Sequence, residues 1–162
     1  MALALLSLGS NLDPEANLRS AARALREAFA DAAFSPVLRY RAVGFEGPDF
    51  LNAAAAFATD LAPARLHDMF HALEDAHGRR RDVPRFSSRT LDIDLVFYGS
   101  LVCDGTEGPR LPRPELKHAF VLEPLALLAP EFVDPVSGES LVALWRAHPD
   151  YRPRPAGEGL TL

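Results

Sequence analysis

Two acidic residues, Asp92 and Asp94, stand two positions apart in the otherwise apolar segment 91–97. Side chains at i and i+2 of a β-strand share a face, so we expect both carboxylates to point the same way, about 6.6 Å apart along the chain. Two like charges on one face call for a cation, and carboxylate oxygens suit Mg²⁺ that also binds substrate phosphates. On these two residues alone, an edge strand with an acidic outer face explains the pattern equally well.

An arginine-rich segment, 79–89, runs directly into this strand. It holds five of the sixteen arginines of the chain and one acid, Asp82. An isolated arginine run is more commonly a solvated loop, but guanidinium groups also bind phosphate oxygens two at a time. Carboxylates for a metal and arginines for phosphate, meeting at one end of one strand, favour phosphoryl transfer. The G-x-x-x-x-G-K-[ST] loop and the protein-kinase motifs are absent, so ATP would be bound on a different scaffold.

The hydrophobic periodicity predicts the elements that carry these residues. We expect strands at 3–8, 34–40, 51–59 and 91–98, a helix that begins with Asp13 as N-cap and Pro14, and a helix from about 60–63 to Gly78. The resulting β-α-β-β-α-β order is typical of a ferredoxin-like α+β fold, an antiparallel sheet with both helices on one face. Prolines after Gly99 predict a C-terminal extension of loops and short helices, with helical stretches within 120–129 and 141–147.

Composition bounds the remaining possibilities. Length predicts a single domain over 1–162, with a poorly ordered tail at 149–162. No apolar run reaches eighteen residues, which argues against a membrane span, and the net charge of −5 argues against nucleic-acid binding. Cys103 is the only cysteine, so an internal disulfide and a cysteine-rich zinc site are excluded. We expect a cytoplasmic monomer.

Five segments of the chain, taken in order, resemble a known family. Over about residues 5–132 the chain resembles the 6-hydroxymethyl-7,8-dihydropterin pyrophosphokinases. The segments are Leu8-Gly9-Ser10-Asn11-Leu12, Pro48-Asp49-Phe50-Leu51-Asn52-Ala53, Glu74 with Gly78-Arg79, Arg89-Thr90-Leu91-Asp92-Ile93-Asp94, and Phe120-Val121-Leu122 with Pro124-Leu125.

The resemblance implies a reaction and the residues that perform it. Pyrophosphate would pass from the co-substrate ATP to the pterin hydroxymethyl oxygen, with release of AMP, as a step of folate biosynthesis. Two Mg²⁺ ions would be held by Asp92 and Asp94. The nucleotide site would contain Glu74 and arginines that bind phosphate, and the pterin would lie between two aromatic rings, with an amide at its polar edge. The arginines are Arg79, Arg81 and Arg89, the rings are Phe50 and Phe120, and the amide is Asn52; Arg79 and Arg89 join the two acids as catalytic residues.

Two loops, 41–48 and 79–88, would close over the substrates, and Gly44 of the first is assigned to the pterin site. The chain departs from the family here: Ala42-Val43 follow Tyr40-Arg41 where the family has Thr and Pro, and Phe86 replaces a tryptophan. Farther on, a histidine and an arginine exchange places. We assign both residues, Arg113 and His118, to the nucleotide site. A relative that acts on a modified pterin, or that only binds pterin or nucleotide, stays open.

Three further readings stay open at this point. The segment His67-Asp68-Met69-Phe70-His71 imitates a zinc-protease motif, with the shorter Asp in place of Glu. A ferredoxin-like fold can also serve as a ligand-sensing or protein-binding module. A metal-dependent phosphohydrolase could use the same two acids. The products formed from ATP would separate these possibilities.

Overall fold

The sheet is antiparallel throughout. Residues 1–79, 82, 88–106 and 108–162 are described by the structure, a computed structural model of the chain. Within these residues five strands form one sheet in the order β2-β4-β1-β5, and β3 also pairs with β4. The strands are β1 (Ala2–Ser10), β2 (Ala33–Phe34), β3 (Leu38–Tyr40), β4 (Phe50–Thr59) and β5 (Asp92–Tyr98).

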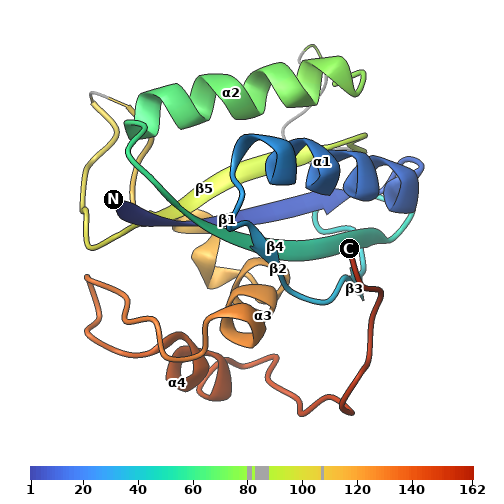
Figure 1. Cartoon of the computed structure of the whole chain (residues 1–162). Coiled ribbons are helices and arrows are strands. Elements are labelled where there is room, and N and C mark those ends of the chain that lie inside the picture. The colour runs from blue at the N-terminus through green and yellow to red at the C-terminus, as the bar shows by residue number, and fades with distance from the viewer. Residues whose placement is uncertain (80–81, 83–87, 107) are drawn as a thin grey trace.

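Helices cover both faces of the sheet (Figure 1). Helices α1 (Pro14–Ala28) and α2 (Pro63–Ala76) lie on one face, and α3 (Ala119–Leu128) and α4 (Leu141–Arg146) lie on the other. A short 3₁₀ helix, η1 (Pro114–Lys117), precedes α3. The predicted α+β fold is confirmed, and the C-terminal short helices form the second layer.

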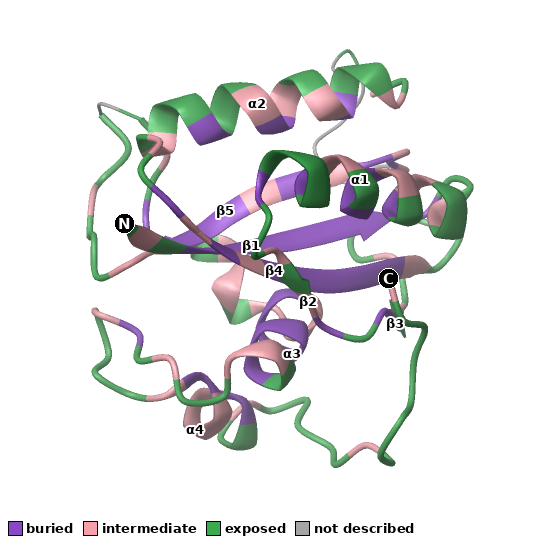
Figure 2. Cartoon of the chain, in the orientation of Figure 1, coloured by how far each residue is buried: buried purple, intermediate pink, exposed green. Residues whose placement is uncertain are grey.

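The central strands are buried on both sides because each face carries a helix layer (Figure 2). In β1, Leu6 and Leu8 pack in the core beneath α1 and α2, whereas Leu5 packs in the core beneath α3 and α4. This arrangement explains why β1 reads as a continuous apolar run rather than an alternating one. In β4, the small alanines at 53, 54 and 55 are fully buried.

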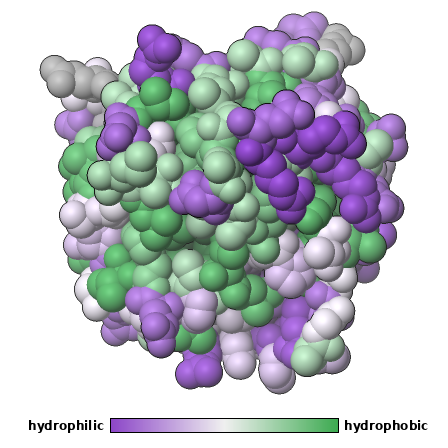
Figure 3. Space-filling model, in the orientation of Figure 1, coloured by the Kyte–Doolittle hydropathy of each residue, from purple (hydrophilic) through white to green (hydrophobic). Residues whose placement is uncertain are grey.

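Helix α1 is amphipathic, as its sequence predicted. Leu18, Ala22 and Leu25 are buried against the sheet, and Phe29, just after the helix, stacks on Phe57 with ring centroids 3.7 Å apart. The outer face carries polar side chains, and Figure 3 shows hydrophilic residues gathered over this helix. The apolar face holds the helix on the sheet that carries the two acids.

One local prediction was wrong, and another was confirmed. Segment 34–40 forms two short strands, because Pro36 has no N–H to donate and Val37 donates instead to Leu160 O at 2.8 Å. Asp13 does occupy the N-cap position, but its backbone is left-handed, with φ 46°, and its side chain makes no capping hydrogen bond. Pro14 fills the first helical turn as predicted.

The C-terminal segment runs back to the sheet. Leu160 pairs with Val37 through two backbone hydrogen bonds, so 149–162 crosses from α4 to the start of β3. The expected poor order of this tail stays a prediction. Across the described ranges, no helix is both long and apolar enough to cross a bilayer.

Candidate active site

A cavity of about 560 Å³ lies where β1, β4 and β5 meet α2, η1 and α3. Ten of the residues predicted for the site line it, and the sequence segments that contribute them are far apart. These residues are Phe50, Asn52, Glu74, Arg79, Arg89, Asp92, Asp94, Arg113, His118 and Phe120. The fold therefore brings these ten residues together, although they are far apart in the sequence.

Asp92 and Asp94 face the cavity, as the two-residue period of a strand predicts. Ile93, between them, is buried in the opposite core. Arg79 Nη1 lies 2.9 Å from Asp92 Oδ1, and Arg113 Nη2 lies 3.2 Å from Asp94 Oδ1. Burial, and then the charge of Asp92, raises the pKa of Asp94 well above its ordinary value, although Arg113 opposes the shift.

This carboxylate pair suits a hard cation. Burial and the charge of Asp92 disfavour the ionised form of Asp94 and raise its pKa more than Arg113 lowers it, and a bound cation would favour the ionised form. Throughout the part of the chain that the structure describes, no group of three or more His, Cys, Asp or Glu side chains could hold a metal ion. Mg²⁺ needs no such cage, since it binds through one or two carboxylates plus water and phosphate oxygens. A catalytic zinc ion, with three protein ligands, fits His67 and His71 less well.

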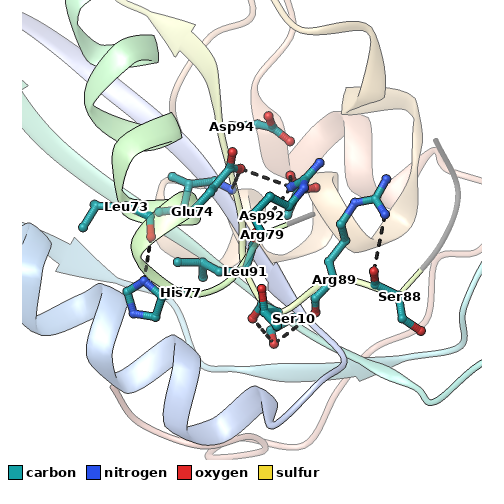
Figure 4. Close-up of polar contacts among 12 residues, drawn as sticks. Ser10, Leu73, Glu74, His77, Arg79, Ser88, Arg89, Leu91, Asp92 and Asp94 are labelled. Atoms are coloured by element: carbon teal, nitrogen blue, oxygen red, sulfur yellow. Dashed lines mark hydrogen bonds and ion pairs between the residues drawn. The ribbon is translucent and has the colours of Figure 1, made fainter. Parts of the chain in front are cut away.

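Glu74 ties the end of α2 to β5. Its Oε2 accepts a hydrogen bond from Ile93 N at 2.9 Å. The same oxygen lies 3.4 Å from Arg79 Nη1 (Figure 4). Burial raises the pKa of Glu74, and the Ile93 N–H opposes that shift. Because Arg79 also donates to Leu91 O, its guanidinium is fixed between α2 and the start of β5. Glu74 therefore orients Arg79 within the cavity.

The backbone at Arg89 and Thr90 is held by the two polar residues where β1 ends. Arg89 N donates to Asn11 Oδ1 at 2.7 Å, and Asn11 N donates in return to Arg89 O at 3.0 Å. Ser10 Oγ donates to Thr90 O at 2.5 Å. Asn11 also reaches the other loop, since its Nδ2 donates to Pro48 O at 3.0 Å. Sequence reasoning gave Ser10 and Asn11 no such role, although two polar residues ending a buried strand could have signalled one.

The other end of the cavity is aromatic and carries an unpaired amide oxygen. Asn52 is only 4% exposed, and its Nδ2 makes a long 3.4 Å hydrogen bond to Leu8 O. Its Oδ1 is buried and has no hydrogen-bond partner within the described chain. Phe50 and Phe120 line the cavity and are partly exposed. A buried polar atom without a partner costs free energy unless a ligand satisfies it.

Further aromatic residues, not assigned from the sequence, complete this end. Phe45 meets Phe50 edge-on with ring centroids 6.3 Å apart, and Tyr40 meets Phe120 edge-on at 6.4 Å. Both Tyr40 and Phe45 line the cavity. His118, the residue before α3, stacks on Phe120 at 4.9 Å, so it borders the aromatic end.

Two predicted residues are not placed at the cavity. Gly44 is not among the lining residues; its φ of 84° makes the turn between Val43 and Phe45, which do line the cavity. Arg81, and with it Phe86 and most of the predicted 79–88 loop, lies outside the described residues.

Comparison with known proteins agrees with this geometry. The sequence model of the 7,8-dihydro-6-hydroxymethylpterin-pyrophosphokinase family matches residues 5–130. The chain belongs to this family. It is accordingly a pyrophosphokinase, as the sequence predicted. The resemblance of its five segments to this family is confirmed.

Three curated relatives of this pyrophosphokinase carry the name 2-amino-4-hydroxy-6-hydroxymethyldihydropteridine pyrophosphokinase. The relative from Synechocystis sp. is 35% identical over 87% of this chain and 73% of its own length. The one from Pseudomonas aeruginosa is 37% identical over 89% of this chain and 90% of its own length. The one from Haemophilus influenzae is 31% identical over 85% and 88%.

Proposed function

We propose that this enzyme transfers the pyrophosphate group of ATP to the hydroxymethyl oxygen of 6-hydroxymethyl-7,8-dihydropterin and releases AMP, a step of folate biosynthesis. One observation carries the proposal: a single cavity has carboxylates and arginines at one end and aromatic rings with an unpaired amide oxygen at the other. The first end suits a metal-bound polyphosphate, and the second suits a flat, polar heterocycle. The family match supports the same reaction.

At the polyphosphate end, Asp92 and Asp94 would hold Mg²⁺, two ions by family resemblance. When bound, the metal would neutralise phosphate oxygens and align the reacting groups. Arg79, whose guanidinium is held by Glu74, and Arg89, whose backbone is held by Asn11, would contact the phosphate oxygens. We assign Arg81, Arg113 and His118 to the nucleotide as well. Preorganised cations stabilise the charge that develops during transfer without having to reorient.

At the aromatic end, Phe50 and Phe120 would stack against the pterin ring. The free Oδ1 of Asn52 would accept a hydrogen bond from the pterin's polar edge, which would satisfy the unpaired atom. Gly44 would contribute through the turn that presents Val43 and Phe45 to the cavity. A ligand with an N–H at that edge is therefore preferred over one without it.

In the reaction, the hydroxymethyl oxygen forms a bond to the β-phosphorus of ATP. The bond from that phosphorus to the oxygen shared with the α-phosphate breaks, AMP leaves with the electron pair, and the hydroxyl proton is released. Positioning and charge stabilisation supply most of the rate, and no dedicated strong base is needed. Closure of the 41–48 and 79–88 loops would exclude water from the β-phosphorus.

Product analysis tests this proposal. Purified enzyme with Mg²⁺, ATP and the pterin alcohol should form AMP and pterin pyrophosphate in equal amounts, and Asp94→Ala should lose this activity while still binding pterin. Free phosphate as the product would indicate a phosphohydrolase. A folded protein that binds pterin and leaves ATP intact would indicate a sensing relative. Metal removal by a chelator should stop turnover, and size-exclusion chromatography should show the expected monomer.

A further inference from the structure

A residue of the C-terminal tail forms a buried ion pair with α3. Arg154 Nε lies 2.6 Å from Glu123 Oε2, and Arg154 Nη2 donates to Glu123 Oε1 at 2.9 Å. This two-point geometry is the strongest form of an arginine–carboxylate contact. Arg154 lies beyond residues 5–130, the part of the chain that the family match covers.

Glu123 needs this partner. It is 1% exposed and sits in the apolar core of α3 beside Leu122 and Leu125. A carboxylate at such a position is costly unless it is paired and hydrogen-bonded. The same Oε1 also accepts a hydrogen bond from Tyr40 Oη at 2.6 Å. Burial, and then the hydrogen bond to Glu123, raises the pKa of Tyr40, so the phenol keeps its proton and remains the donor.

Tyr40 links the Arg154–Glu123 ion pair to the cavity. It is the last residue of β3, its ring lines the cavity, and it immediately precedes the 41–48 loop. One face of its ring lies 5.8 Å from the Arg154 guanidinium, and Phe120 meets it edge-on. Phe120 lies one helical turn before Glu123 on α3. Arg154, Glu123 and Tyr40 therefore join the tail, α3 and β3 directly behind the aromatic end.

The backbone of the tail pairs with the residue before β3. Val37 N donates to Leu160 O at 2.8 Å, and Leu160 N donates to Val37 O at 3.2 Å. Gly159 has a φ of 98°, and a Cβ there would lie 2.5 Å from Val37 O. Glycine is thus required for the tail to reach the start of β3. The tail is therefore held at the start of β3, a few residues after Arg154.

We propose that Arg154 is a positioning residue for the pterin half of the cavity: through Glu123 and Tyr40 it fixes the ring of Phe120 and the start of the 41–48 loop. The inference rests on the proposed function, since it assigns the aromatic end to pterin. At the polyphosphate end, Asp92 and Asp94 lie on β5 and Glu74 lies on α2, outside this network, although His118 stacks on Phe120. Loss of Arg154 should therefore weaken pterin binding and leave ATP binding nearly unchanged.

The test compares Arg154→Ala, Arg154→Lys and the control Arg152→Ala. Arg152 carries the same charge in the same segment, is exposed, and does not line the cavity. Steady-state kinetics should show the pterin KM of Arg154→Ala raised about tenfold or more, with the ATP KM changed by less than about twofold. Arg154→Lys should restore part of the loss, and Arg152→Ala should match the unaltered enzyme. Pterin affinity measured by fluorescence, without turnover, should follow the same order.

Tyr40→Phe provides a second route if Arg154→Ala fails to fold. It removes one hydroxyl and keeps the ring, so it should raise the pterin KM selectively; in the double variant the two effects should be less than additive. Unchanged pterin KM, or equal rises in the KM values for both substrates, would overturn the role of Arg154. Absence of pterin-dependent AMP from the unaltered enzyme would instead overturn the proposed function itself.

Discussion

Replacing Asn11 with alanine should loosen both loops that border the cavity. The Asn11 side chain is buried and makes three hydrogen bonds: it accepts from Arg89 N at 2.7 Å and donates to Pro48 O at 3.0 Å and to Ser88 Oγ at 3.2 Å. The two donated bonds contribute about 1 kcal/mol each, and the buried Arg89 N–H left without its acceptor costs about 1–3 kcal/mol, which gives about 3–5 kcal/mol in total. This is a large share of the roughly 5–15 kcal/mol that stabilises a typical domain.

Urea unfolding of Asn11→Ala measures this cost as the fall in the free energy of unfolding. Asn11→Asp separates the accepted bond from the two donated bonds, because it keeps an acceptor for Arg89 N and loses both donors. Its free energy of unfolding should lie between those of the unaltered enzyme and Asn11→Ala. Asn17→Ala is the matched control, since that amide makes one exposed hydrogen bond, to Leu12 O, and its loss should cost about 0.5 kcal/mol. Asn11→Ala should also raise the ATP KM, because Arg89 loses its anchor. A loss below about 1 kcal/mol, with an unchanged ATP KM, would refute the reasoning.

Three further predictions follow from the same structure. Gly9→Ala would place a Cβ 2.7 Å from Asn52 Nδ2, so the amide must shift and the pterin KM should rise in steady-state assays; a normal pterin KM would mean that Asn52 does not bind pterin. Asp94→Asn should stabilise the metal-free protein, because each unit by which folding raises the pKa of Asp94 costs about 1.4 kcal/mol of stability once the carboxyl is ionised. This cost is absent below about pH 4 and grows as the pH rises, so melting scans should show a gain in stability near pH 7 that vanishes near pH 3. A loss of stability near pH 7 would contradict the prediction. Phe57→Ala empties a buried site stacked on Phe29 and should cost about 3–5 kcal/mol in urea unfolding, against a negligible change if the core were loosely packed.

The regular elements could be predicted because their patterns are local. The spacing of Leu18, Ala22 and Leu25 defines one face of α1, and the alternation at Asp92 and Asp94 defines one face of β5. The prediction of one strand over 34–40 was wrong because it overlooked Pro36, which lacks an N–H, and because Val37 pairs with a distant residue, Leu160. A strand propensity carries no information about such a partner.

In the candidate site too, some residues could be predicted from local sequence patterns and others could not. The acids and arginines of the polyphosphate end could be read from residue type and spacing, whereas Phe50 and Phe120 resemble ordinary core aromatics and were reached only through the family resemblance. The partners of Asn11 and Arg154 could not be predicted, because each contact joins elements that are distant in the sequence. A proline-rich tail gives no local sign that one of its arginines pairs with a buried glutamate.

The central claim is that one cavity brings the β-phosphorus of ATP to the pterin hydroxymethyl oxygen. ATP labelled at the β-phosphate tests it most directly when it is incubated with the enzyme, Mg²⁺ and 6-hydroxymethyl-7,8-dihydropterin and the products are separated. The account predicts that the label moves to the pterin, that AMP is unlabelled and equal in amount, and that Asp94→Ala transfers none. Label recovered as inorganic phosphate or pyrophosphate at the same rate with and without pterin would contradict it.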